Sequence, residues 1–436
     1  MRHAPIDPAL FAANRRRLVQ LLPPKAVAML HAADVLPTTG DSCLKIHPAG
    51  DLFWASGIEQ EESVLVLAPQ ATEPSHREML FVRQPNEHLA TWEGEKLSKD
   101  RAQQISAVSK VRWLSELPAA VHTLLCESDS VWLNANEHER AVIEVESRDV
   151  RLARKLMHDY PLHRFERLAP LLRKLRAVKT PAEVDLLRRA IDITDAGLRR
   201  VLGTLRPGLM EFDLEAELSA EFIRRRGRMA YEPIIGSGRN ACILHYLDND
   251  RECRDGDLVL IDVGSSYANY NADLTRTYPV NGRFTPRQRA VYEAVLRVLR
   301  SSIARTTVGT RLRDWKRAAQ VEMTGELLTL GLISPEEAAR DSAEEPACRK
   351  YFMHGLGHSL GLGVHDMAPV DGPLEAGWVM TVEPGIYIPE ENIAVRLEND
   401  VVVTAKGPVD LCSHVPIEPD DIERLMAGSA NGGRRV

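Results

Sequence analysis

Four carboxylates in the C-terminal half of the sequence lie in or beside apolar, strand-like segments. Asp262 ends a run of four apolar residues, and Asp273 follows in the next extended segment. Glu383 precedes a Pro-Gly turn, and Glu398 lies in a segment of alternating apolar and polar residues. Taken singly, each residue is most often a cap or a surface group. Because charges are rarely buried without partners, the four placements together predict a cation-binding site.

Three histidines and one arginine accompany these carboxylates. His354 and His358 lie in one Gly-rich motif, and His365 follows it. Strand alternation places Arg396 on the same face as Glu398. We therefore expect a carboxylate-rich site with one or two imidazole groups. An alternative for Arg396 is a buried counter-ion without a further role.

The elements around these residues indicate a change of architecture near residue 175. Before it, four short apolar segments, Ala26–Leu30, Ser63–Ala68, Met79–Arg83 and Val131–Asn134, alternate with helix-like stretches such as Glu137–Leu156. This alternation predicts an α/β domain over residues 1–174.

A second domain is expected over residues 175–426. Thr180-Pro181-Ala182-Glu183 is a capping box that begins a helix, and later helices are expected at Asp213–Arg226, Pro286–Ile303 and Arg313–Leu330. Extended segments are expected at Asp257–Val263, Asn271–Val280, Val379–Tyr387 and Ile393–Thr404. Residues 427–436 are rich in Gly, Ser, Asn and Arg, which predicts a disordered tail.

Composition limits the class of protein. The chain has 436 residues, enough for two domains, and a formal net charge of −7, which argues against a nucleic-acid or anionic-membrane partner. Its six cysteines form no C-x-x-C pair, which fits a reducing compartment better than a disulfide framework. We find no signal-peptide core and no apolar run that could span a bilayer. These observations predict a cytoplasmic protein.

The order Asp262, Asp273, His358, Glu383, Glu398 resembles the pita-bread metallopeptidases, which include methionine aminopeptidase, prolidase and aminopeptidase P. Within that group the closest similarity is to aminopeptidase P, through the segments Cys242–Tyr246, Thr275–Gly282, Tyr351–His358 and Thr381–Tyr387. The resemblance covers residues 175–425 well. Asp51–Gly57 resembles, more loosely, a creatinase-type N-terminal domain. The implied fold is α/β overall, with a creatinase-like α/β domain followed by an α+β pita-bread catalytic domain.

The resemblance implies two divalent metal ions, with Asp262 on one, His358 and Glu383 on the other, and Asp273 and Glu398 between them. Four carboxylates and one imidazole favour Mn²⁺, while Co²⁺ or Zn²⁺ could substitute. A hydroxide held between the ions would attack the scissile carbonyl.

Roles for the remaining candidates also follow from the resemblance. Glu383 would move a proton toward the departing proline nitrogen. His245, His354 and His365 would line the substrate pocket, and Arg396 would orient the ligands or the substrate, with Tyr387 a weaker candidate. The implied partners are peptides with proline at the second position, and the implied assembly is a homo-oligomer, either a dimer or a tetramer.

Two alternatives remain open at the level of sequence. A prolidase, which cleaves Xaa-Pro dipeptides, would use the same metal set. A metal-free pita-bread scaffold or binding protein is more remote, because all five ligand positions carry metal-competent side chains. In addition, only eighteen positions separate His365 from Glu383, whereas aminopeptidase P relatives often have a longer loop there, which leaves the preferred substrate length open.

Overall fold

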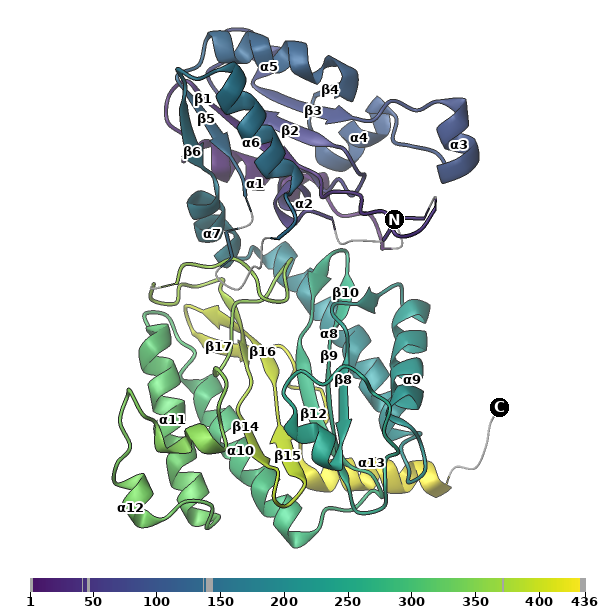
Figure 1. The fold of residues 1–436 in the computed structure, drawn as a ribbon, viewed down its shortest axis with the longest axis vertical. Helices are drawn as coiled ribbons and strands as arrows, with labels where there is room; N and C mark the ends of the chain where they lie inside the picture. The colour runs from purple at the N-terminus through teal and green to yellow at the C-terminus, as the bar shows by residue number, and fades with distance from the viewer. Residues whose placement is uncertain are drawn as a thin grey trace. The chain divides into compact units, whose positions relative to one another are not determined.

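The structure is a computed structural model that describes residues 3–431 except 41, 45–47, 136, 139–143 and 371. Contacts within the chain define two compact units, one formed by Ala4–Arg176 and the other by Ala177–Val436 together with Met1–His3. Figure 1 shows the elements of each unit.

The N-terminal unit is built around one mixed sheet with the strand order β4-β3-β2-β1-β5-β6. Alternate apolar side chains of its central strands, among them Val27, Met29, Val64 and Val66, belong to one buried cluster, as the two-residue period of a strand requires. The strands are β1 (Ala26–His31), β2 (Val64–Leu67), β3 (Glu78–Val82), β4 (Lys110–Trp113), β5 (Ser130–Leu133) and β6 (Arg164–Arg167). The helices are α1 (Pro8–Val19), α2 (Gly50–Ser56), α3 (Glu87–Glu93), α4 (Lys99–Ser106), α5 (Leu117–Cys126), α6 (Arg148–Asp159) and α7 (Ala169–Ala177).

One helix of this unit begins later than its sequence predicted. The helix expected over Glu137–Leu156 begins only at Arg148, because Ser147 has an extended backbone and its hydroxyl accepts a hydrogen bond from the amide of Val150. Residues 139–143 of the expected range lie outside the described residues. The prediction was therefore wrong for the described residues before the cap.

The C-terminal unit combines helices with several small antiparallel sheets. The helices are α8 (Pro181–Leu202), α9 (Glu211–Arg224), α10 (Pro286–Ala304), α11 (Leu312–Thr329), α12 (Pro335–Ala338) and α13 (Pro419–Asn431). The strands are β7 (Arg228–Met229), β8 (Ile234–Ser237), β9 (Leu258–Val263), β10 (Ser265–Tyr267), β11 (Tyr270–Asn271), β12 (Leu274–Pro279), β13 (Val379–Val382), β14 (Gly385–Ile388), β15 (Ile393–Arg396), β16 (Asn399–Thr404) and β17 (Gly407–Asp410).

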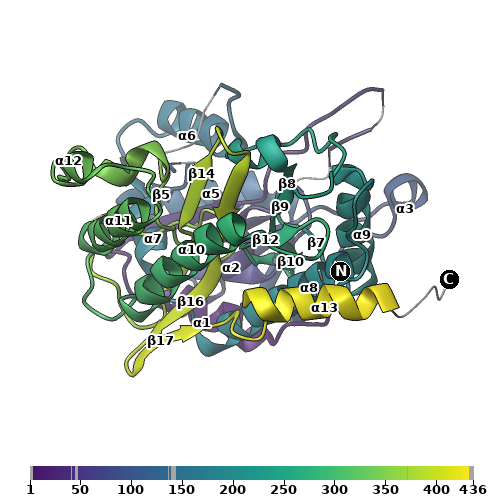
Figure 2. The ribbon, with the colours of Figure 1, turned by 90° about the horizontal axis from the view of Figure 1, so that it is seen from below.

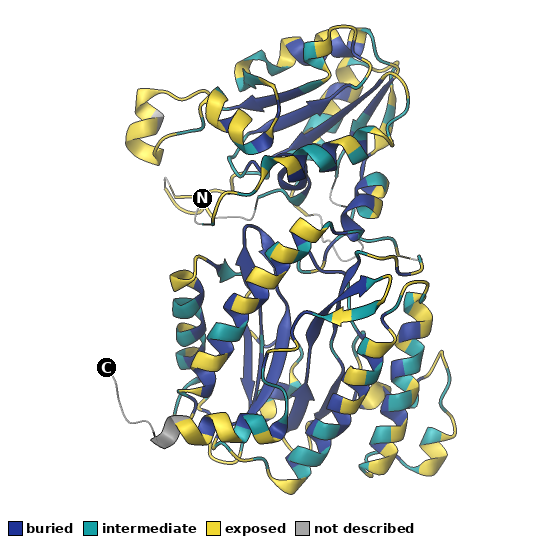
Figure 3. Ribbon diagram, turned by 180° about the vertical axis from the view of Figure 1, so that it is seen from behind, coloured by how far each residue is buried: buried dark blue, intermediate teal, exposed yellow. Residues whose placement is uncertain are grey.

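Long amphipathic helices pack against the strands of this unit. Helix α8 begins at the predicted capping box, in which Thr180 and Glu183 bond each other's backbone amides, and it contacts β10 and β11. Helix α10 contacts β13 and β15. Figure 3 shows the helices exposed on their outer faces while strands such as β12, β13 and β15 are buried. Figure 2 shows the ribbon from below. The bounds expected for α9, α10 and α11 differ from the observed ones by at most two residues.

Three of the expected strands are interrupted, and each interruption contains a candidate ligand. Asp273 lies between β11 and β12, Glu383 lies between β13 and β14, and Glu398 lies between β15 and β16. At Glu383 the following proline has no N–H to donate to a ladder, which accounts for the end of the strand. The sequence pattern predicted continuous strands here, and the breaks are a correction to it.

The C-terminal helix also differs from its prediction. Helix α13 runs to Asn431, so residues 427–431, expected to be disordered, are helical. Ile422 and Met426, four positions apart, are buried on one face of this helix and anchor it. Residues 432–436 lie outside the described residues.

Among the described residues, no helix is both long and apolar enough to cross a membrane. All six cysteines carry free thiols in the structure.

Candidate metal centre

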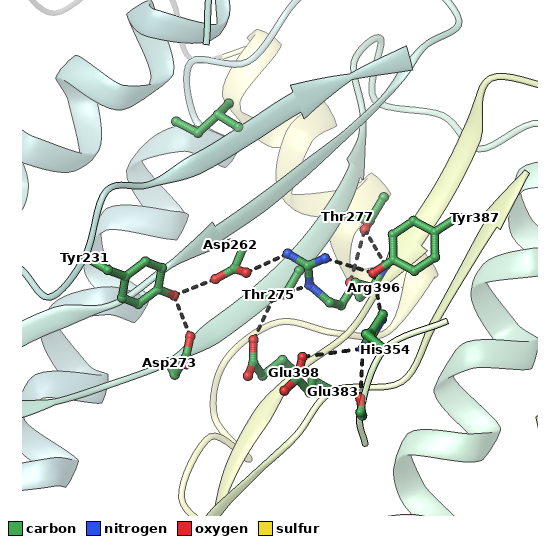
Figure 4. Close-up of polar contacts among 12 residues, drawn as sticks. Tyr231, Asp262, Asp273, Thr275, Thr277, His354, Glu383, Tyr387, Arg396 and Glu398 are labelled. Carbon is green, nitrogen blue, oxygen red and sulfur yellow. Dashed lines mark hydrogen bonds and ion pairs between the residues drawn. The ribbon is translucent and has the colours of Figure 1, made fainter. Parts of the chain in front are cut away.

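Strand β9 and the three strand interruptions bring four carboxylates to one place in the C-terminal unit. Asp262 belongs to β9, which pairs with β12, so that Asp262 and Thr275 are direct partners across the ladder. Glu398 donates its backbone amide to the carbonyl of Thr275, which joins the β15–β16 break to the same strand. Figure 4 shows Asp262, Asp273, Glu383 and Glu398 converging.

His358 completes this group of side chains. One ligand atom each from Asp273, His358 and Glu398 lie within 4.8 Å of one another. The Nε2 of His358 is 3.4 Å from Oδ2 of Asp273 and 3.7 Å from Oε1 of Glu383. Asp273, His358 and Glu398 come from three separate segments, and each directs an oxygen or nitrogen atom to a common point.

The orientation of His358 is set by its neighbours. Its backbone amide donates to Oγ1 of Thr381, and its Nδ1 lies 3.2 Å from the carbonyl oxygen of Ser359. Because a carbonyl oxygen only accepts, Nδ1 carries the proton of the neutral ring, and Nε2 is the nitrogen that faces the carboxylates. This is the tautomer that a metal ligand needs.

A second chain of hydrogen bonds runs from Asp262 to His354 (Figure 4). Arg396 is 2.5 Å from Asp262 and donates to the hydroxyl of Tyr387 at 2.8 Å. The hydroxyl of Tyr387 is 2.9 Å from Nε2 of His354, whose Nδ1 is 2.8 Å from the carbonyl oxygen of Gly355. The bonds have one consistent polarity when His354 is neutral, with Tyr387 donating to it.

Tyr231 lies between the first two carboxylates. Its hydroxyl is hydrogen-bonded to both Asp262 and Asp273. A phenol has only one proton to donate, so the two carboxylates share a single donor. Burial, together with the charge of Asp262, raises the pKa of Tyr231 well above its usual value.

The site has more negative than positive charge. Burial raises the pKa of Glu398 well above its ordinary value, and the charges of Asp273 and Glu383 raise it further. Burial also raises the pKa of Glu383 to about 7 against the opposing effect of His358 and Arg396. Without a cation, these carboxylates resist ionisation. The donor set therefore fits divalent cations, which would replace the protons.

The histidines divide into two kinds. Burial, with Arg396 nearby, lowers the pKa of His354 to about 3. Burial alone would lower the pKa of His358, but the hydrogen bond to Asp273 and the charge of Glu383 raise it overall. His354 is therefore neutral at physiological pH, while the protonation of His358 depends on its carboxylate neighbours.

Two further predicted residues are exposed histidines beside this group. His365 is exposed, and its ring stacks on His358 with 4.0 Å between centroids. His245 is exposed and lies close enough to His354 to contribute to its lowered pKa. Both therefore border the centre.

Sequence reasoning did not single out four residues of the site. Thr275 donates its hydroxyl to Glu398, and Thr381 accepts from the amide of His358. The buried carboxylate of Asp400 accepts from the amide of Asp273. Thr275 and Thr381 each lie two positions from a predicted ligand, a spacing that could have suggested them. Tyr231, the fourth, lies outside any strand, so no periodicity could have indicated it.

Two segments of the chain match models of known protein families. Residues 185–405 match the model of metallopeptidase family M24, and residues 11–132 match that of the aminopeptidase P N-terminal domain. The chain belongs to metallopeptidase family M24. Its two matched segments have the order expected of a two-domain M24 member, which confirms the predicted fold class.

Individual members of the M24 family are similar over nearly the whole chain. The Xaa-Pro aminopeptidase of Escherichia coli K12 is 35% identical, with 96% of this chain and 98% of that protein covered. A zinc-substituted Escherichia coli aminopeptidase P in complex with product has a TM-score of 0.86 at 32% identity, covering 98% of this chain and 99% of the other. The same enzyme with the inhibitor Pro-Leu has a TM-score of 0.85 at 34% identity, covering 98% and 100%.

Proposed function

We propose that this M24 chain is a metal-dependent Xaa-Pro aminopeptidase, which removes the first residue from peptides with proline at the second position. The observation that carries the proposal is the convergence of Asp262, Asp273, Glu383 and Glu398 with the Nε2 of His358. Its support from relatives is the similarity to Xaa-Pro aminopeptidases along both domains.

The proposed ligands of two divalent cations are Asp262, Asp273, His358, Glu383 and Glu398. The cations would lower the pKa of a water molecule and polarise the carbonyl group of the scissile bond through its oxygen. Oxygen donors predominate, so we propose Mn²⁺ as the physiological metal, with Co²⁺ or Zn²⁺ able to substitute.

Glu383 is proposed to move the proton that the leaving nitrogen requires. In the absence of a cation, burial raises the pKa of Glu383 to about 7, so this carboxyl group can gain or lose a proton near neutral pH. The nitrogen of a proline is a tertiary amide, so it must gain a proton to leave as a secondary amine. Oε2 of Glu383 is 3.7 Å from Nδ1 of His354. The carboxyl group of Glu383 therefore lies between the ligand cluster and a pocket histidine, where it can carry this proton.

The chain from Arg396 through Tyr387 to His354 is proposed to hold the substrate side of the centre rigid. Arg396 is buried and bonded to Asp262, so it fixes the ligand and the tyrosine together. We propose that His354, with His245 and His365, contacts the substrate. All three roles would use imidazole as a hydrogen-bonding group.

The decisive experiment is hydrolysis of a paired substrate set, Xaa-Pro and Xaa-Pro-Yaa-Zaa, by Mn²⁺-loaded protein. We expect faster release of the first residue from the longer peptide, and loss of activity in Glu383→Ala and in metal-stripped protein. Cleavage confined to the dipeptide would instead establish the prolidase alternative. Metal binding without activity on either substrate would point to the scaffold alternative.

We also propose that the protein is a cytoplasmic homo-oligomer, a dimer or a tetramer. Light scattering coupled to gel filtration measures the assembly directly. A mass equal to one chain at working concentration would contradict this proposal.

A further inference from the structure

A buried ion pair joins Lys179 to Asp366, one position after the candidate His365. Nζ of Lys179 is 3.3 Å from Oδ2 of Asp366, and their side chains are 1% and 2% exposed. Lys179 also donates to Oγ of Ser359 at 3.4 Å. Two charges so deeply buried are stable only with each other's charge and further hydrogen bonds. They belong to no part of the mechanism described above.

The backbone of Lys179 is held as firmly as its side chain. Its amide donates to the carbonyl of Gly377 at 2.8 Å, and the amide of Gly377 donates to Val403 at 2.8 Å. Gly377 has a φ of +96°, and a Cβ there would lie 2.9 Å from the carbonyl oxygen of Lys179. The ammonium group therefore extends from a fixed point of the main chain.

The ion pair closes the loop that joins His358 to His365. Asp366 accepts from the amide of Gly363 at 3.2 Å and donates its own amide to the carbonyl of Ser359 at 2.8 Å. That same carbonyl fixes Nδ1 of His358. The two histidines, one at each end of the loop, stack on each other.

The loop has no room to relax around this pair. A Cβ on Gly361 would lie 2.2 Å from Oδ2 of Asp366 and 2.9 Å from Cε of Lys179. On its other side, Asn271 donates its side-chain amide to the carbonyls of Gly361 and Leu362. The loop is thus fixed between Lys179 and the segment that leads to Asp273.

We propose that Lys179 is a positioning residue for the metal centre, acting through Asp366 and Ser359 on His358 and His365. It holds the carbonyl of Ser359 where it sets the tautomer and direction of the His358 ring. The inference rests on the proposed function only for the identity of the reaction.

The test compares Lys179→Met, Asp366→Asn, Lys179→Arg and the exposed control Lys174→Met. Calorimetry measures the Mn²⁺ affinity of the metal-free protein. Steady-state hydrolysis of an Xaa-Pro-Yaa-Zaa peptide gives kcat and KM, and circular dichroism gives the melting temperature. We expect Lys179→Met and Asp366→Asn to lose about 10- to 100-fold in Mn²⁺ affinity and in kcat, with a smaller change in KM. Lys179→Arg should recover part of both losses, and the control should match the wild type.

A double variant, Lys179→Met with Asp366→Asn, addresses the risk of unfolding because it leaves no unpaired buried charge. We expect it to fold with the metal affinity of the single variants. A lower melting temperature with unchanged affinity and kcat in the folded variants would overturn the inference. If the wild type binds Mn²⁺ but cleaves no Xaa-Pro peptide, the proposed function fails while the affinity measurement still decides the role of Lys179.

Discussion

At the scale of single residues, the centre depends on which protons its side chains hold. Arg396 donates to Tyr387, and the hydroxyl of Tyr387 lies beside the neutral ring of His354. This order of donors and acceptors requires a neutral imidazole, and burial, with Arg396 nearby, lowers the pKa of His354 to about 3. Removing the hydroxyl of Tyr387 would leave Nε2 of His354 without its donor and an N–H of Arg396 without its acceptor.

Tyr387→Phe should therefore impair catalysis. We expect kcat/KM to fall by about 10- to 100-fold, because the residue joins a ligand's partner to a pocket histidine. Steady-state hydrolysis of an Xaa-Pro-Yaa-Zaa peptide measures it. The matched control is Tyr278→Phe, since the buried hydroxyl of Tyr278 has no hydrogen-bond partner among the described residues. Equal losses in the two variants would show that Tyr387 acts only through packing.

Metal affinity should rise with pH between about 5.5 and 7. In the metal-free protein burial raises the pKa of Glu383 to about 7, and a cation binds only the deprotonated group. Because binding releases one proton from Glu383, the Mn²⁺ affinity falls by about tenfold for each unit that the pH drops below 7. Above pH 7 this contribution levels off. Calorimetric titration in buffers of different ionisation enthalpy counts the released protons. An affinity that is flat across this range would contradict the raised pKa.

At the scale of elements, the site is a set of strand breaks held together by close backbone approach. The segment around His358 runs beside β13, because Glu383 donates to Leu356 and Thr381 donates to His358 through their backbone amides. This approach is so close that a Cβ on Gly357 would lie 2.0 Å from the carbonyl oxygen of Thr381. Glycine is required there by space, since no turn conformation demands it.

Gly357→Ala should push His358 away from β13. We expect loss of most Mn²⁺ affinity and activity, with a destabilisation of about 1–3 kcal/mol from the clash. Gly355→Ala is the matched control in the same motif, since a Cβ there meets nothing within 4 Å. Mn²⁺ calorimetry and urea unfolding compare the two variants. Tolerance of Gly357→Ala would mean that the segment moves freely relative to β13.

At the scale of the whole molecule, the two units contribute differently to its pH dependence. The metal centre is confined to the C-terminal unit, whereas the N-terminal unit contains a buried histidine of its own at the end of β1. Burial, with Arg148 nearby, lowers the pKa of His31 to about 4. Folding therefore favours the neutral ring, and acid favours the unfolded chain.

The stability of the N-terminal unit should fall as the pH drops from about 6.5 to about 4. Above pH 6.5 His31 is neutral in both states, and below it the unfolded state takes up a proton that the folded state excludes until about pH 4. The loss attributable to His31 is about 2–3 kcal/mol. Urea unfolding at pH 7 and pH 4.5 measures it. Between these two pH values, His31→Gln should lose less free energy of unfolding than the wild type. The exposed control His158→Gln should lose as much as the wild type.

The sequence by itself determined the family, the two-domain α/β architecture and the residues expected to bind metal. Capping residues, apolar periodicity and a distinctive order of carboxylates and histidines are local properties, so they can be recognised without tertiary contacts. The family and the fold class are confirmed by the comparisons, whereas the ligand and catalytic roles stay predictions.

Only the tertiary structure decided how these residues meet. Strand pattern predicted continuous segments through Glu383 and Glu398, yet both lie at breaks, because the chain must leave one sheet to approach another. Tyr231 is distant in sequence from its partner Asp262, and Lys179 is distant in sequence from its partner Asp366. Their roles arise from burial and from the direction of single hydrogen bonds, which depend on the folded surroundings of each group and leave no periodic signal in the chain.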